Sequence, residues 1–158
     1  MRKIFVEFLL SKMKEDPNTI LLTGDLGYGL FDIIRERFPE QFFNFGSSEL
    51  TMVTAACGMT LEGKKVYCYS ITPFILWRPF EAIRNYLDKE MISVKLIGGG
   101  RDREYGYLGF SHWGDDDLKF MSQFEKIISR KPIDDAALIN CLEDAHNSSL
   151  PYYINLKK

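Results

Sequence analysis

Two side chains in this sequence occupy positions that suit proton transfer. Glu49 follows Gly46-Ser47-Ser48, at the point where a short strand passes into a helix. His112 lies in the glycine-bounded aromatic segment Gly109 to Gly114, and an imidazole changes charge near neutral pH. A positioned carboxyl and a positioned imidazole are both typical acid–base groups. Each also has a structural interpretation, because acids favour the first turn of a helix and loop histidines often only pack.

Other groups give weaker indications of chemistry. Asp115-Asp116-Asp117 has the composition of a cation site, but acids also suit the start of a helix, which is the better interpretation. The loop Gly24 to Gly29 has neither the dinucleotide spacing of glycines nor a phosphate-binding lysine after it. His146 is predicted to be a solvated residue at a helix end.

The cysteines and histidines are few and scattered. Cys57, Cys68 and Cys141 each lie in an apolar context, which predicts buried thiols in a reducing compartment and hence a cytoplasmic protein. The two histidines and the spaced cysteines do not form a metal-ligand motif, so we expect no zinc site.

Composition excludes several classes of function. The chain has 158 residues, with 20 Lys plus Arg against 22 Asp plus Glu, for a formal net charge of −2. Without a surplus of basic residues, it is not expected to bind nucleic acids in general. Its apolar stretches are too short to span a bilayer, and its first residues lack a signal-peptide cleavage site, so we expect neither membrane insertion nor secretion.

Hydrophobic periodicity predicts helices and strands that alternate along the whole chain. Helices are predicted at residues 2–15, 31–38, 49–61, 76–90 and 115–121, with a last helix capped by Asp134 or Asp135. Strands are predicted at residues 19–23, 42–45, 66–71, 94–97, 127–128 and 152–156. We expect Gly98-Gly99-Gly100 to end the fourth strand, and Leu50, Val53, Cys57 and Leu61 to form one apolar stripe.

This alternation predicts a three-layer α/β/α fold with a mostly parallel sheet, formed by residues 1–158 as a single domain. In such sheets, ligands bind beyond the carboxyl ends of the strands. The predicted ends lie at residues 24–25, 46–49, 71–74 and 98–114. Glu49 and His112 are therefore expected at the same edge of the sheet.

Several segments follow one another in a distinctive order. They are Leu22–Gly27, Arg37–Gly46, Ser48-Glu49 with Met52–Met59, Arg78–Arg84, Gly109–His112 with Asp116-Asp117, and Pro151–Ile154. Their colinear order resembles the pyrimidine-binding domain of transketolase and of its relative 1-deoxyxylulose-5-phosphate synthase. The resemblance covers nearly the whole chain and implies a thiamine-diphosphate-binding fold.

The resemblance implies a catalytic role for Glu49. In this family, a glutamate at this place hydrogen-bonds N1′ of the thiamine aminopyrimidine. Its proton favours the tautomer whose nitrogen deprotonates C2 of the thiazolium ring. Burial beside a stacked ring favours the protonated carboxyl that this chemistry needs.

Other residues receive roles from the same resemblance. The family stacks an aromatic side chain on the aminopyrimidine, and Phe74 matches it by residue type whereas Ile75 matches it by spacing. Trp77 and Asp25 are expected near the cofactor. His112 resembles the family's histidine that handles protons on the substrate oxygen.

Two positions depart from the family pattern. Leu50-Thr51 stands where relatives usually carry Gln or His after the glutamate. Leu108 stands where transketolase carries an aspartate that reads sugar hydroxyls, which argues against an ordinary ketose-phosphate donor.

The sequence contains no Gly-Asp-Gly motif followed by Asn, which holds Mg²⁺ and diphosphate in the family. The resemblance therefore implies a separate diphosphate-binding subunit that supplies the metal site. We expect this chain to form a homodimer alone and a heterotetramer with that subunit. The complete enzyme is expected to transfer a two-carbon unit between small sugar or keto substrates. The alternatives are a subunit of a 2-oxo acid decarboxylase and a non-catalytic scaffold.

Overall fold

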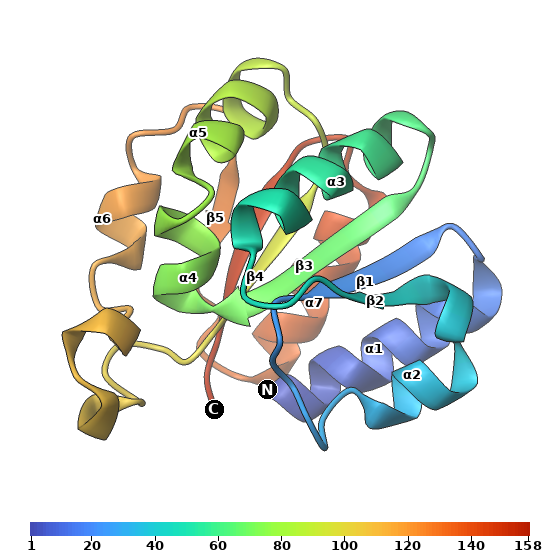
Figure 1. The fold of residues 1–158 in the computed structure, drawn as a ribbon, viewed down its shortest axis with the longest axis horizontal. Helices are drawn as coiled ribbons and strands as arrows, with labels where there is room; N and C mark the ends of the chain where they lie inside the picture. Colours follow the sequence, from blue (N-terminus) through green and yellow to red (C-terminus); the bar gives the residue numbers. More distant parts are fainter.

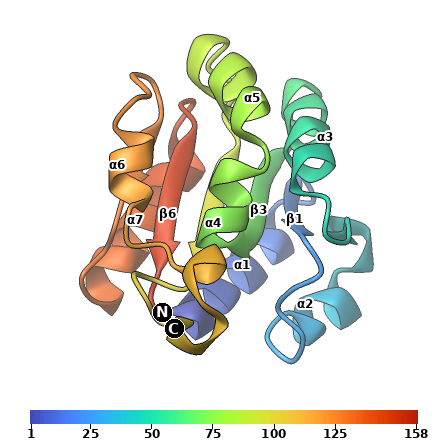
Figure 2. The ribbon, with the colours of Figure 1, turned by 60° about the vertical axis from the view of Figure 1, so that its left-hand side comes forward.

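The computed structural model describes residues 1–158 as a sheet with helices on both faces (Figure 1). One face is covered by α1 (Arg2–Glu15), α2 (Asp32–Arg37) and α7 (Asp135–Asn147). The other face is covered by α3 (Glu49–Leu61), α4 (Thr72–Trp77), α5 (Phe80–Ala82) and α6 (Asp117–Met121). Figure 2 shows the two helical layers on either side of the strands. The predicted α/β/α architecture is confirmed.

All six strands run parallel, in the order β2-β1-β3-β4-β6-β5. They are β1 (Thr19–Thr23), β2 (Phe42–Asn44), β3 (Lys65–Ile71), β4 (Lys95–Gly99), β5 (Ile128–Arg130) and β6 (Tyr152–Leu156). The four inner strands are buried along almost their whole length, because helices cover both of their faces. This burial explains why their sequences are nearly continuous apolar runs.

Each face of the sheet has its own apolar core. Phe5 and Leu9 of α1 pack with α7 on one face, and the predicted inner stripe of this helix is confirmed. On the other face, α3 contributes Met52, Val53 and Ala56. Asp134 is the N-cap of α7, as predicted, because its Oδ1 accepts a hydrogen bond from the Ala137 amide at 2.8 Å.

The predicted stripe of α3 is wrong at both of its ends. Leu50 and Leu61 are 49% and 72% exposed, whereas Met52, Ala56 and Glu49 are buried. The helix is therefore rotated so that its small and unbranched residues face the sheet, and its first carboxyl lies inside.

The connection after β3 also differs from the prediction. We predicted a loop at residues 72–75 and a helix at 76–90, but α4 begins at Thr72, directly after the strand. Pro73 is compatible with a first helical turn, whose amides need no partner, and Pro79 interrupts the helix before α5. Residues Ile83–Lys89 then form a π-helix.

Gly98 and Gly99 belong to β4 and do not end it, contrary to the prediction. A β-carbon on Gly99 would lie 2.4 Å from the Tyr69 hydroxyl, and one on Gly98 would lie 2.8 Å from Thr72 Oγ1. These glycines let the strand pass close to neighbouring side chains. Gly100, with φ of 83°, is where the chain turns away.

Short 3₁₀ segments complete the chain, at Pro39–Gln41, Gly106–Leu108 and Phe110–His112. No helix in the structure combines the length and apolarity needed to cross a membrane.

Candidate active site

The carboxyl edge of the sheet gathers four segments of the chain. They are the loop after β1, the start of α3, helix α4 and the long segment between β4 and α6 (Figure 1). Parallel strands end at one edge, so segments far apart in sequence meet there. Glu49 and His112 belong to two of these segments, as predicted.

Glu49 is the first residue of α3 and is 1% exposed. Its Oε1 accepts a hydrogen bond from Ser70 Oγ at 2.8 Å, and its Oε2 accepts one from Arg78 Nη1 at 2.7 Å. Gly24, at the end of β1, approaches the same carboxylate, and a β-carbon there would lie 3.1 Å from Oε1. A buried acid with this many polar partners is more than a first-turn acid that faces solvent.

Phe74 and His112 lie in contact next to this carboxylate. Their ring centroids are 4.9 Å apart, in an edge-to-face arrangement. The Arg78 guanidinium carbon lies 3.7 Å from the Phe74 ring centroid, so this cation covers a face of the ring. Glu49, Arg78, Phe74 and His112 therefore form a continuous row of contacts, here called the Glu49 row.

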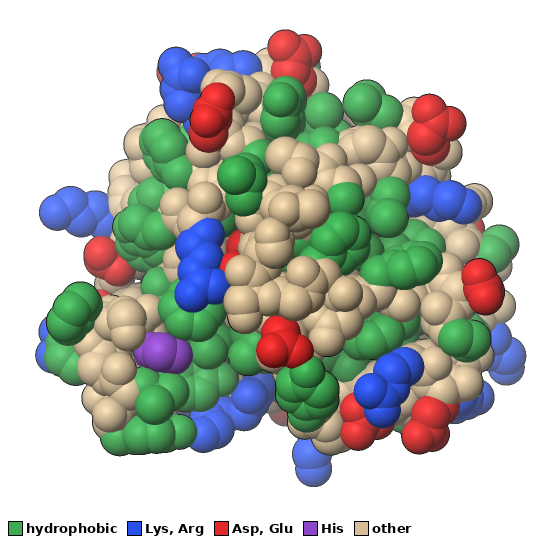
Figure 3. Space-filling view, in the orientation of Figure 1, with side chains coloured by type: hydrophobic (Ala, Val, Ile, Leu, Met, Phe, Trp, Pro, Cys, Tyr) green, Lys and Arg blue, Asp and Glu red, His purple; other side chains and the backbone are tan.

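A hollow of about 430 Å³ opens beside the Glu49 row. Its walls come from α4 and from the segment that carries His112, and its lining residues are Pro73, Phe74, Trp77, Arg78, Phe110, Ser111, Trp113 and Asp116. Figure 3 shows a histidine among hydrophobic side chains on this face, over the segment that joins β4 to α6. The hollow is apolar on several sides, with one cation and one carboxylate.

The segment that carries His112 is anchored at both of its ends. Arg101 donates to Asn155 Oδ1 from Nε at 2.9 Å, and to the Asn155 carbonyl from Nη2 at 2.7 Å. The Gly114 amide donates to the Asp102 carbonyl at 2.7 Å, which closes the segment into a loop. The Ser111 hydroxyl and Nδ1 of His112 are 3.0 Å apart.

Ile75 and Trp77, both expected near the cofactor, do not join the Glu49 row. Ile75 is fully buried in the core between the sheet and α3. Trp77 packs against Phe120 with ring centroids 4.7 Å apart, although it also lines the hollow.

Asp25 lies one residue beyond Gly24 and is exposed. Its φ of 59° is left-handed, and its amide donates to Asn44 Oδ1 at 2.9 Å. Its carboxylate accepts a hydrogen bond from the Tyr28 hydroxyl. In this structure its contacts fix the loop after β1.

His146 is not the solvated residue that we predicted. It is 8% exposed, with Nδ1 3.0 Å from the Tyr67 hydroxyl and Nε2 3.3 Å from Lys65 Nζ. Burial, and then the nearby Lys65 charge, lower the pKa of His146. It lies at the amino edge of the sheet, away from the Glu49 row.

The three aspartates at residues 115–117 have separate environments. Asp117 is buried and accepts a hydrogen bond from the Tyr153 hydroxyl at 2.8 Å, and Asp115 pairs with Arg103 at 2.7 Å. Asp116 is the N-cap residue of α6. No group of three or more His, Cys, Asp or Glu side chains is arranged to hold a metal ion.

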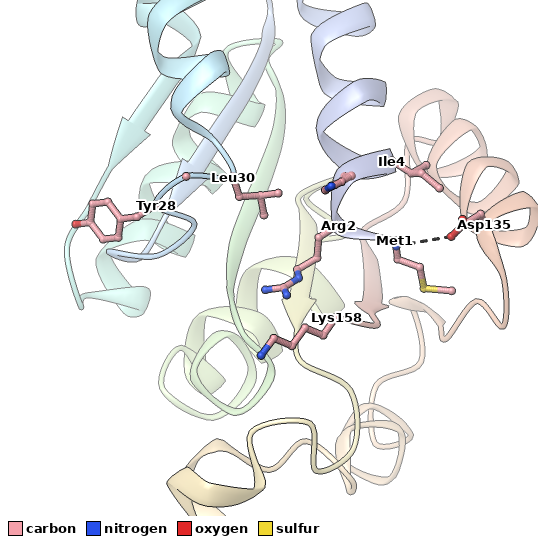
Figure 4. A pocket seen from close by; sticks show the side chains of 9 residues that line it. Met1, Arg2, Ile4, Tyr28, Leu30, Asp135 and Lys158 are labelled. Atoms are coloured by element: carbon pink, nitrogen blue, oxygen red, sulfur yellow. Dashed lines mark ion pairs between the residues drawn. The ribbon is translucent and has the colours of Figure 1, made fainter.

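A larger hollow, of about 570 Å³, lies where the first and last residues of the chain meet. In Figure 4 the Met1 amino group pairs with Asp135, at 3.6 Å, and Arg2 and Lys158 extend on the other side of Met1. None of the residues in the Glu49 row lines it.

Sequence reasoning did not identify Ser70 and Arg78 as the partners of Glu49. Ser70 is the penultimate residue of β3, the strand next to β1, so the predicted strand order contained a signal for it. Arg78 reaches Glu49 only because α4 begins at Thr72, four residues earlier than predicted.

The whole chain, residues 1–158, matches the family model described as the transketolase pyrimidine binding domain. A transketolase C-terminal section of Methanocaldococcus jannaschii is 28% identical over 159 residues, which cover 100% of this chain and 50% of the relative. A subunit of the apulose-4-phosphate transketolase of Actinobacillus succinogenes is 27% identical, over 99% of this chain and 50% of its own.

A solved structure of a split-gene transketolase, described as an inactive beta4 tetramer, has the same fold. It aligns with a TM-score of 0.86 and 27% identity, over 98% of this chain and 50% of that chain. The chain thus spans about half the length of these relatives.

Proposed function

Because the chain belongs to the family of transketolase pyrimidine-binding domains, we propose that it is one subunit of a thiamine-diphosphate-dependent transketolase-like enzyme. The observation that carries this proposal is the buried Glu49 carboxyl beside the Phe74 ring, at the edge of the sheet where ligands bind. The names of the similar proteins, a transketolase C-terminal section and a subunit of another transketolase, support the same proposal.

The residues of the Glu49 row fit the aminopyrimidine half of the cofactor. A planar heteroaromatic ring can stack on Phe74 while one ring nitrogen meets the Glu49 carboxyl. Gly24 leaves room beside the carboxyl that a β-carbon would fill. The edge-to-face contact of Phe74 with His112 and the burial of Ile75 favour Phe74 as the stacking residue.

The chain does not supply a matching site for the diphosphate and its metal. No acidic or histidine cluster has the arrangement of a cation site, and the Gly-Asp-Gly motif is absent from the sequence. We therefore propose that a second subunit holds Mg²⁺ and the diphosphate. Tyr107 and Phe110, which are 83% and 85% exposed beside the hollow, suit coverage by such a partner in a heterotetramer.

When bound, thiamine diphosphate supplies an acidic carbon, C2 of its thiazolium ring, as the nucleophile for two-carbon transfer. Glu49 holds a proton toward N1′ of the aminopyrimidine, and Ser70 keeps the carboxyl in position through Oε1. His112 lies at the mouth of the hollow, where its imidazole can exchange a proton with a substrate oxygen. The apolar walls around Trp113 and Phe110 exclude water from that exchange.

The three free cysteines, two of them buried, support a reducing location such as the cytoplasm for this subunit.

The proposal is tested by proton/deuterium exchange at C2 of thiamine diphosphate bound to the complex of this chain with its diphosphate-binding partner. We expect Glu49→Gln to assemble normally and to slow exchange by about 10²–10⁴-fold, the usual contribution of an acid–base group. Glu81→Gln is the control, because Glu81 is an exposed first-turn acid of α5. Exchange at the wild-type rate in Glu49→Gln would make Glu49 a structural acid and refute the proposal.

A further inference from the structure

The Arg78 guanidinium makes two contacts that define its position. Its Nη1 donates to Glu49 Oε2 at 2.7 Å, and its carbon lies 3.7 Å from the centroid of Phe74. One planar cation therefore pairs with the buried carboxylate and covers the neighbouring aromatic ring at the same time.

These are the two interactions that the proposed function requires of the aminopyrimidine. That ring also needs a hydrogen bond to the Glu49 carboxyl and a face of Phe74. A planar guanidinium with N–H donors has the shape and the hydrogen-bonding groups to imitate it. Arg78 and the aminopyrimidine cannot occupy this place together.

The two oxygens of Glu49 differ in how readily their partners can leave. Ser70, on Oε1, is fully buried in β3 and has no space into which to move. The Arg78 side chain, on Oε2, is 43% exposed and follows the last residue of α4. An incoming ligand therefore reaches Glu49 by replacing Arg78.

The hollow beside the Glu49 row offers Arg78 an alternative position. Arg78 and Asp116 line the same space of about 430 Å³, and Asp116 is exposed. A guanidinium that leaves Glu49 can turn toward this carboxylate while its charge stays hydrated.

We propose that Arg78 acts as a stand-in for the aminopyrimidine: it occupies the Glu49–Phe74 site in the free chain and is displaced when the cofactor binds. This inference rests on the proposed function of Glu49 and Phe74. It makes Arg78 the residue that sets the affinity of this half of the site, in direct competition with the ligand.

The test uses the 158-residue chain and a neutral probe, 4-amino-5-hydroxymethyl-2-methylpyrimidine, which corresponds to the pyrimidine half of thiamine. Its dissociation constant is measured by NMR titration for wild type, Arg78→Met and Arg84→Met. Arg84 is the matched control, because its Nη1 bonds only the exposed neighbour Asn85. We expect Arg78→Met to bind the probe about tenfold more tightly than wild type, the combined worth of an exposed ion pair and a cation–π contact. Arg84→Met should match wild type.

A salt titration gives a second readout. Chloride screens the Arg78–Glu49 pair but not a neutral probe, so wild-type affinity should rise with ionic strength, whereas Arg78→Met should show no such rise. Equal or weaker binding by Arg78→Met would overturn the stand-in role and leave the proposed function intact. Absence of probe binding in every variant would instead refute the aminopyrimidine site itself, and the inference with it.

Discussion

The backbone of Gly24 lies against the carboxylate of Glu49, so that a β-carbon at this glycine would lie 3.1 Å from Oε1 and 3.4 Å from Ser70 Oγ. Gly24 ends β1 and Glu49 begins α3, which makes this contact the closest approach between the loop after β1 and the proposed acid. The position of the carboxyl therefore depends on the absence of a side chain 25 residues earlier in the chain.

Gly24→Ala should shift the Glu49 carboxyl by a few tenths of an ångström and weaken binding of the pyrimidine probe several-fold. Its free energy of unfolding should change by less than about 1 kcal/mol, because the substitution adds one methyl group at a site whose neighbour can move. Probe titration and urea denaturation measure the two effects.

The control for this substitution is Gly58→Ala, in the middle of α3, where a β-carbon would meet nothing within 4 Å. It should leave probe binding unchanged and stabilise the protein by about 0.5–1 kcal/mol, since alanine favours a helix interior over glycine. Equal effects of the two substitutions on the probe would show that Gly24 does not position Glu49.

Asn155→Leu is expected to destabilise the anchor of the His112 segment. Asn155 donates to Thr72 Oγ1 at 3.0 Å and to the Tyr153 hydroxyl at 3.1 Å, and accepts from Arg101 Nε at 2.9 Å. Each of these groups keeps one other partner, so the free energy of unfolding should fall by about 1–3 kcal/mol. Asn147→Leu, which removes only an exposed side-chain bond to its own helix, should cost less than about 0.5 kcal/mol.

The unfolding free energy should rise with pH between about pH 7 and 8.5 because of Lys95. Burial, and then the charge of Lys65, lower the pKa of Lys95 from 10.5 to about 7. In this pH window the unfolded chain keeps the proton that the folded protein releases, so unfolding takes up a proton and becomes less favourable as pH rises. His146, whose lowered pKa acts in the same direction, has completed most of its change below this window.

Urea denaturation at several pH values measures this slope for wild type and for Lys95→Met. The variant loses three hydrogen bonds, to Ser93 Oγ and to the Ser148 and Leu150 carbonyls, and should be less stable at every pH. Its slope between pH 7 and 8.5 should be close to zero. A slope equal to that of wild type would mean that another group causes the dependence.

Above about pH 9 the wild-type slope should reverse. Burial raises the pKa of Cys57 to about 11 and that of Cys68 well above its usual value. In this range the unfolded chain releases two thiol protons that the folded protein keeps, which outweighs the one proton that it retains on Lys95. The same urea series, extended to pH 10, measures the reversal, and Cys57→Ala should weaken it.

Periodicity was sufficient to predict most of the architecture, because buried parallel strands and amphipathic helices leave strong patterns. The helix at residues 2–15 and the strand at residues 152–156 have the bounds that we predicted. The pattern failed where a local signal had two meanings. Pro73 ends many helices but here lies in a first turn, and Gly98-Gly99 can break a strand but here allows close packing against Tyr69 and Thr72.

The candidate site was predictable only in part. The rule that strand ends converge brought Glu49 to the same edge as Phe74 and His112, and these three residues do lie in one row of contacts. The ion pair with Arg78 was not predictable, because it depends on the exact start of α4. His146 was misjudged because its partners, Tyr67 and Lys65, come from a strand 79 and 81 residues earlier.

The place of β6 in the sheet constrains the order in which this protein can fold. β5 pairs only with β6, although it is synthesised first, and β6 also covers the free side of β4. The strands β2, β1, β3 and β4 can therefore assemble during synthesis, whereas the remaining pairings must wait for residues 152–156. Such long-range parallel pairing is slow to form. Until it is complete, the nascent chain presents the unpaired backbone of β4, which is the point at which it is most exposed to pairing with another chain.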